Sequence, residues 1–112
     1  MTTDADIPLD ITPEELARRI ARGDAPLLLD VRQPEEHAYV SLASSTLIPL
    51  PELAARLGEL AKTEEIVAYC HHGVRSRHAA LFLRAQGYTR ARTLVGGIDA
   101  WTNRVDPSLP RY

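Results

Sequence analysis

The sequence has 112 residues and a mass of 12.4 kDa, the size of one domain. Hydrophobic residues make up 45% of the chain and charged residues 25%, so there are enough apolar side chains for a core and intrinsic disorder is excluded. The longest apolar stretch, residues 25–29, is too short to cross a membrane. A net charge of −2 and a pI of about 6.1 argue against a nucleic-acid-binding protein.

The beginning of the chain is polar and acidic and does not resemble a signal peptide. Cys70 is the single cysteine, which excludes an internal disulfide and is typical of a reducing compartment. We therefore expect a cytoplasmic protein. Residues 1–8 carry little pattern and are expected to form a flexible tail, which leaves residues 9–112 as the domain.

The first predicted element is a helix that begins after Thr12 and ends before Gly23. Thr12 can cap this helix, Pro13 suits its first position, and Glu15 is placed to bond back to the cap. The apolar residues 27–31 follow and are typical of a buried parallel strand. The sequence thus opens with a helix and an inner strand of a parallel sheet.

The middle of the chain predicts shorter elements. A brief helix begins near residues 33–36, with Glu35 and Glu36 as carboxylates of its first turn. Residues 46–48 are a candidate short strand, and residues 51–60 predict a helix with leucines on one face.

The last part predicts a strand at residues 65–70, a helix at 75–86, a strand at 92–95 and a short helix around 98–101. Trp101, in the last of these helices, is expected to anchor it to the core. Short apolar runs that alternate with amphipathic segments are typical of an α/β domain. We therefore predict a central, mostly parallel sheet of four or five strands.

Cys70 is the strongest candidate for a catalytic residue. It ends a predicted strand and precedes a glycine-containing loop and a helix, and ligands bind beyond the carboxyl ends of strands in open parallel sheets. Unpaired N–H groups and the dipole of the following helix favour negative charge, so a thiolate at this place is stabilised as a nucleophile. A lone cysteine that is only a small buried hydrophobe is the alternative.

The residues after Cys70 support this interpretation. Gly73 permits the conformations by which successive N–H groups form an anion-binding nest. Arg75 can hold an anionic substrate or pair with Asp30, and Ser76 is placed to cap the helix or to donate to the thiolate. His71 and His72 are expected at the rim of the site, facing solvent. We expect no metal, because the usual spacing of metal ligands is absent.

Four ordered segments resemble the rhodanese-like sulfurtransferases, and the resemblance covers residues 11–112. Residues 70–76, CHHGVRS, are similar to the family's active-site loop C-x-x-G-x-R-S, and residues 30–36, DVRQPEE, to its D-V-R-x-P-x-E segment. Ile48-Pro49-Leu50 matches I-P-L, and residues 96–101 match G-G-x-x-x-W. The ending, residues 105–112, resembles a bacterial subgroup found free-standing and as the last domain of sulfur-carrier-activating enzymes.

The sequence departs from the family at residues 40–45, where VSLASS stands in place of G-H-I-P-G-A. Both glycines and the histidine are missing. The segment therefore lacks the residue type that most easily adopts the backbone conformations of a tight turn. The loop from Cys70 to Arg75 has six residues, as in the sulfurtransferases. Related phosphatases and arsenate reductases have one residue more, which argues against those activities here.

The resemblance implies a rhodanese-like three-layer α/β domain, with a parallel sheet of about five strands and helices on both faces. It implies that Cys70 takes a sulfur from a donor such as thiosulfate, forms a persulfide and passes the sulfur to cyanide or a cellular thiol. The donor would be bound by the loop residues, namely His71, His72, Gly73, Val74, Arg75 and Ser76. Asp30 and Arg32 would support the loop.

A sulfur carrier without turnover of its own is the alternative function. The expected partners are a small-molecule donor and acceptor, with a cysteine desulfurase, thioredoxin or a sulfur-carrier protein as further candidates. No cofactor, nucleic acid or membrane is expected. The sequence leaves open which donor and acceptor are used.

Overall fold

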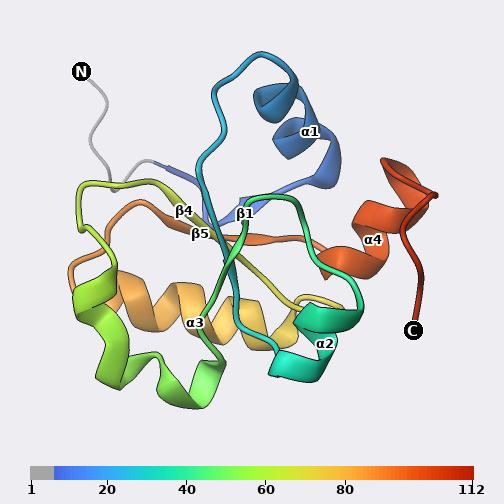
Figure 1. Ribbon diagram of the computed structural model, residues 1–112. Coiled ribbons are helices and arrows are strands. Elements are labelled where there is room, and N and C mark those ends of the chain that lie inside the picture. The colour runs from blue at the N-terminus through green and yellow to red at the C-terminus, as the bar shows by residue number, and fades with distance from the viewer. Residues whose placement is uncertain (1–6) are drawn as a thin grey trace.

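The computed structural model describes residues 7–112, so most of the predicted flexible tail lies outside the described residues. A parallel sheet of five strands, in the order β1-β5-β4-β2-β3, runs through the middle of the molecule (Figure 1). The strands are β1 (Asp10–Ile11), β2 (Leu27–Asp30), β3 (Thr46–Leu47), β4 (Ile66–Tyr69) and β5 (Ala91–Leu94). The predicted α/β class is confirmed.

Helices cover both faces of the sheet, as predicted. One face packs against α1 (Pro13–Ala21) and α4 (Gly97–Arg104), and the other against α3 (Val74–Ala85) and two 3-10 helices, η2 (Leu50–Glu52) and η3 (Ala54–Glu59). The short α2 (Pro34–Tyr39) follows the carboxyl end of β2 (Figure 1). Within residues 7–112, no helix has both the length and the apolar character needed to cross a membrane.

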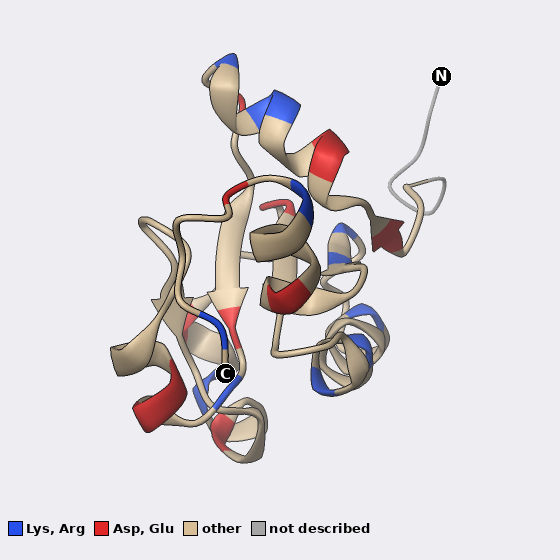
Figure 2. Ribbon diagram, turned by 90° about the vertical axis from the view of Figure 1, so that its right-hand side faces the viewer, with Lys and Arg blue, Asp and Glu red and all other residues tan. Residues whose placement is uncertain are grey.

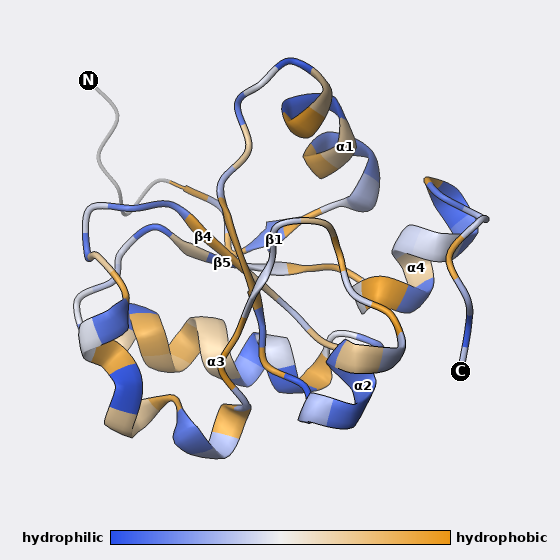
Figure 3. Ribbon diagram, in the orientation of Figure 1, coloured by the Kyte–Doolittle hydropathy of each residue, from blue (hydrophilic) through white to orange (hydrophobic). Residues whose placement is uncertain are grey.

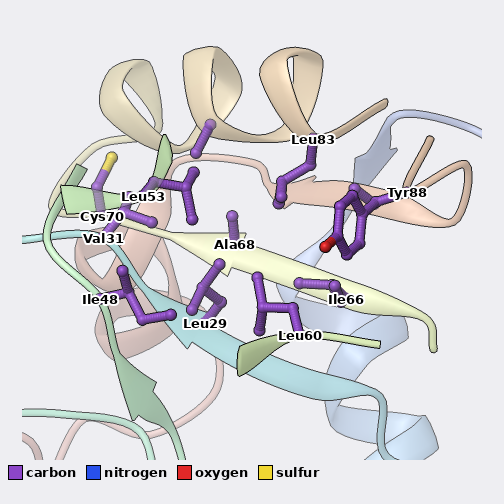
Figure 4. Packing of buried hydrophobic residues seen from close by; sticks show 12 residues of the cluster. Leu29, Val31, Ile48, Leu53, Leu60, Ile66, Ala68, Cys70, Leu83 and Tyr88 are labelled. Carbon is purple, nitrogen blue, oxygen red and sulfur yellow. The ribbon is translucent and has the colours of Figure 1, made fainter. Parts of the chain in front are cut away.

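Alternate residues of the inner strands supply two separate cores. Leu29, Ala68 and Cys70 point toward α3, and Figure 4 shows their side chains beneath that helix. Leu28 and Val67 point the other way, into a cluster that includes Trp101, whose predicted role as a core anchor is confirmed. β2 (LLLD) and β4 (IVAY) are accordingly apolar along most of their length (Figure 3), because both faces are covered.

The start of α1 follows its prediction. Thr12 Oγ1 accepts a hydrogen bond of 3.1 Å from Glu15 N, Pro13 occupies the first turn, and Gly23 follows the helix with a φ of +74°. The preceding strand, β1, was not predicted. It has two residues, and its pairing of Ile11 with Leu94 places it at the edge of the sheet beside β5.

The helix predicted at residues 51–60 is wrong. The chain forms η2 and η3 instead, and Arg56, inside η3, departs from helical geometry at φ −116° and ψ 17°. Its guanidinium bonds Glu52 and Glu59, on either side of the kink. The leucine spacing still identified residues of the core, because Leu53 and Leu60 are buried under α3.

Candidate active site

Cys70 lies at the carboxyl end of β4, under the first turn of α3 (Figure 4). Its side chain is 1% exposed. The sulfur accepts hydrogen bonds from Gly73 N at 3.1 Å and Ser76 N at 3.4 Å, and its thiol donates to Ser76 Oγ at 3.5 Å. Backbone N–H groups that point at the sulfur favour a negative charge there, and the stabilised thiolate stays a prediction.

Gly73 is the residue that turns the loop into α3. It is the N-cap, with a φ of +108°, a conformation that side chains strongly disfavour. A Cβ at this position would also lie 3.3 Å from Gly96 N. The capping role considered for Ser76 is therefore wrong: its hydroxyl instead lies between Cys70 and Thr93, 2.7 Å from Thr93 Oγ1.

The loop is held from behind by the start of α4. Ile98 N donates to Cys70 O at 2.9 Å, and Asp99 N donates to His71 O at 3.1 Å. Gly97, with a φ of +65°, lies so close to these two carbonyls that a Cβ would collide with both. The sequence signal for this contact was the Gly96-Gly97 pair, which matches the start of the family's G-G-x-x-x-W segment.

Arg75 does not pair with Asp30, which corrects that alternative. Its guanidinium forms two hydrogen bonds with Glu36 of α2, Nη1 to Oε1 at 2.7 Å and Nη2 to Oε2 at 3.0 Å. Arg75 lowers the pKa of Glu36 to about 2. The pKa of Arg75 is raised, first by these bonds and in lesser part by the nearby Cys70.

Asp30 and Arg32 form a fully buried ion pair, each with 0% of its side chain exposed. Arg32 Nε and Nη2 bond the two carboxylate oxygens of Asp30 at 2.9 and 2.7 Å. The remaining guanidinium hydrogens reach Val40 O at 2.6 Å and the hydroxyl of Tyr112 at 2.8 Å. The pair therefore ties the end of β2 to the segments around the site.

His71 and Tyr112 form a stack at the edge of the loop. The ring of His71 lies 3.8 Å from that of Tyr112 at 7° and 3.9 Å from that of His72 at 30°. Burial, followed by the charge of His72, lowers the pKa of His71. The prediction of two solvent-facing histidines holds for His72, whereas His71 is half-buried. Val74 is exposed.

Tyr112 is a site residue that sequence reasoning missed. Its hydroxyl accepts the bond from Arg32 and donates to Glu36 Oε2 at 2.7 Å, across 76 residues of sequence. The chain after α4 turns back toward α2 to make these contacts (Figure 1). The similarity of residues 105–112 to a subgroup ending was the available signal, but it assigned no contact to this side chain.

His71, His72 and Asp99 are of metal-ligating type, and their ligand atoms lie within 4.8 Å of one another. The two imidazoles are stacked, so their nitrogens lie in nearly parallel planes and do not converge on one ion. Asp99 Oδ1 is also bonded by Arg111 at 3.0 Å. The geometry fits a metal poorly, and the absence of a metal remains a prediction.

Known proteins resemble the chain over most of its length. A sulfurtransferase from Allochromatium vinosum is 37% identical over 82% of this chain and 86% of that protein. The putative sulfur carrier protein YrkF of Bacillus subtilis is 31% identical over 87% of this chain and 52% of that protein. The chain spans 23% of the maize adenylyltransferase and sulfurtransferase MOCS3-1, at 36% identity and 91% of its own length.

Solved structures agree with the sequence relatives. The crystal structure of a rhodanese-like domain protein from Staphylococcus aureus superposes with a TM-score of 0.81, at 30% identity, over 94% of this chain and 99% of that one. The family model described as the rhodanese-like domain matches residues 12–104. The cysteine loop, the parallel sheet and these relatives agree. The chain therefore belongs to the rhodanese-like domain family and is, at family level, a sulfurtransferase.

Proposed function

We propose that this protein transfers sulfane sulfur through a persulfide on Cys70. The observation that carries the proposal is the position of the sulfur, which accepts N–H bonds from Gly73 and Ser76 at the start of α3. These donors are in place before a substrate binds, so they stabilise a thiolate at Cys70 without reorganisation. Their alignment favours nucleophilic chemistry over a merely packed thiol.

In the first half-reaction the thiolate of Cys70 attacks the outer sulfur of a donor such as thiosulfate. The S–S bond of the donor breaks, sulfite leaves with the bonding electron pair, and Cys70 carries the added sulfur as a persulfide. The N–H groups of residues 71–75 are proposed to cradle that terminal sulfur. Arg75 and the loop side chains of His71 and His72 line the approach.

In the second half-reaction an acceptor nucleophile attacks the terminal sulfur, and the thiolate of Cys70 leaves. Cyanide is the acceptor that an assay would use, and a thiol would serve in the cell. Splitting the transfer into two displacements avoids a direct reaction between donor and acceptor. The thiolate that leaves is stabilised by the same N–H groups that stabilised it for attack.

A carrier fed by a partner protein is the second candidate, because a relative is named as a putative sulfur carrier. In that case a cysteine desulfurase would load Cys70, and a thioredoxin or a sulfur-carrier protein would unload it. The chemistry at Cys70 is the same, and the two candidates differ in the donor that reaches it.

The test is the intact mass of the reduced protein after incubation with thiosulfate and then with cyanide. A gain of one sulfur atom that is lost with cyanide supports the enzyme, with Cys70→Ser as the control that gains nothing. No gain with thiosulfate but a gain with a cysteine desulfurase and cysteine supports the carrier. Equal sulfur gain by Cys70→Ser would overturn both.

A further inference from the structure

The Glu36–Arg75 ion pair is a feature of the site that the transfer chemistry leaves unexplained. Both terminal nitrogens of Arg75 point at the Glu36 carboxylate, at 2.7 and 3.0 Å, so the open end of its guanidinium fork is already occupied. Figure 2 colours the acidic residues red and the basic residues blue along the chain, and this pair joins α2 to α3. Arg75 is thus a neutralised cation beside the nucleophile, not a free anion receptor.

The carboxylate of Glu36 is fixed from its other side as well. Gln33 N donates to Oε1 at 3.0 Å, and the hydroxyl of Tyr112 donates to Oε2 at 2.7 Å. With the two bonds from Arg75, the carboxylate receives four donors, each of which favours its ionised form. The pKa of Glu36 is accordingly held at about 2, and its negative charge is permanent at any physiological pH.

The other charges around the loop are paired too. Arg32 is bonded to Asp30, Asp99 is bonded to Arg111, and the lowered pKa of His71 keeps its ring neutral near pH 7. When Cys70 is a thiolate, its negative charge is opposed by N–H dipoles, and every one of these cations is already matched by a carboxylate. The three ion pairs named here cancel and the thiolate charge remains, so a donor with two negative charges meets no unpaired cation among these groups.

We propose that Glu36 is a specificity-determining residue, which makes the site favour sulfane-sulfur donors of low charge over dianionic donors. The proposal rests on the function proposed above and narrows its donor class. Thiosulfate, with two charges, is disfavoured, and donors with one charge or none are preferred. The repulsion from Glu36 grows in proportion to the charge of the donor, which makes the effect measurable with matched molecules.

Methanethiosulfonate, CH₃SO₂S⁻, is the matched donor for thiosulfate. It presents the same outer sulfur on the same tetrahedral sulfur centre, with a methyl group in place of one charged oxygen. The Cys70 thiolate attacks the outer sulfur, the S–S bond breaks, and methanesulfinate leaves with the electron pair, where sulfite leaves from thiosulfate. Both reactions place one sulfur on Cys70 and need no further oxidant or reductant.

The test compares the wild-type protein with Glu36→Gln, which keeps an oxygen for Arg75 but removes the charge. Because thiosulfate has twice the charge, we expect its KM to fall about tenfold where that of methanethiosulfonate falls about threefold. Glu36→Met, an apolar side chain of similar length, is a second variant in case the amide disturbs the fold. Glu35→Gln is the control, because this neighbouring carboxylate is exposed, and it should leave both KM values unchanged.

Alkylation of Cys70 gives a readout that does not depend on sulfur transfer. Iodoacetate and iodoacetamide attack the same thiolate and differ by one charge, so the ratio of their rate constants cancels any change in the nucleophile itself. We expect Glu36→Gln and Glu36→Met to raise the iodoacetate-to-iodoacetamide ratio about threefold, and Glu35→Gln to leave it unchanged.

The outcomes separate the two proposals. A raised alkylation ratio together with a greater gain for thiosulfate supports the role of Glu36. An unchanged ratio, equal shifts for the two donors, or a higher KM for thiosulfate would overturn that role, the last because Glu36 would then be positioning Arg75 for the anion. If the ratio rises but no donor loads Cys70, the proposed sulfur transfer fails while the electrostatic effect of Glu36 stands.

Discussion

Ser44 shows how a single residue accommodates the departure from the family pattern. It stands where the family has its second glycine, and it is the non-glycine residue with a positive φ, +65°, among residues 7–112. Ser45 N donates to Leu42 O at 3.1 Å, so the turn closes without glycine. Val40, at the first glycine position, has ordinary extended geometry at φ −155°. The lack of glycine therefore strains the backbone at Ser44 and leaves it unstrained at Val40.

Replacing Ser44 by glycine is expected to stabilise the protein. The left-handed conformation costs a side-chain-bearing residue about 1–2 kcal/mol, and the larger entropy of glycine in the unfolded chain takes back part of this. We expect a net gain of about 0.5–1 kcal/mol, seen as a Tm several degrees higher. Ser41→Gly, in the same segment but without a positive φ, is the control and should lower the Tm.

His71 makes stability depend on pH. Burial and the neighbouring His72 lower its pKa below 6.5, so the unfolded chain binds a proton more readily than the folded one. The contribution of His71 is complete above pH 6.5 and is lost as pH falls toward the folded pKa. His71→Phe retains a ring to stack on Tyr112 and should reduce the loss of Tm between pH 7 and 5. A loss of Tm between pH 7 and 5 equal to that of the wild type would contradict this. His78→Gln is the control and should leave that loss unchanged.

At the scale of elements, the start of α4 holds the loop that follows Cys70. Gly97 has no room for a Cβ beside the carbonyls of Cys70 and His71, and its φ is positive. Gly97→Ala should therefore cost about 2 kcal/mol or more and slow the loading of sulfur on Cys70. Urea unfolding and the persulfide mass assay measure the two effects. Gly58→Ala, with open space around it, is the control and should change neither.

Elements with strong local signals were predicted from the sequence. The cap at Thr12, the proline of α2 and the apolar runs of β2 and β4 fix their own elements, because the signal and the structure are local. The two-residue strand β1 has no such pattern, since pairing with β5 alone defines it. The segment after Pro51 has helical leucine spacing, but two short turns bury those leucines equally well.

The candidate site divides in the same way. The loop from Cys70 to Ser76 is contiguous, so its pattern could be read directly. The partners of the site are not contiguous: Glu36 reaches Arg75 across 39 residues, and Tyr112 reaches Glu36 across 76. A carboxylate that already has a local role at the start of α2 gives no sign of a second partner on another helix.

At the scale of the whole molecule, the buried Asp30–Arg32 pair joins segments from across the chain. It connects the end of β2 with Val40 and Tyr112 while both charges are shut off from water. Such a pair contributes little net stability when intact, but removal of Arg32 leaves the buried carboxylate of Asp30 without its guanidinium, beside His37 Nδ1 at 2.8 Å.

Arg32→Met is therefore expected to lower the free energy of unfolding by about 3–5 kcal/mol. The double variant Asp30→Asn/Arg32→Met should recover part of that loss, because the stranded charge is gone. Urea denaturation of the wild type, both single variants and the double variant completes the cycle. A double variant whose loss equals the sum of the two single losses would show that the charges are not coupled.

The bonds from α4 to the carbonyls of Cys70 and His71 also have a consequence for timing. Peptide groups whose carbonyls are held by these hydrogen bonds resist rotation when a sulfur atom is added at Cys70. The empty and the sulfur-bearing protein would then differ by one atom and not by a rearranged backbone. For the proposed persulfide cycle we therefore expect the arrival and departure of donor and acceptor to set the rate of turnover, and not a conformational change of the loop.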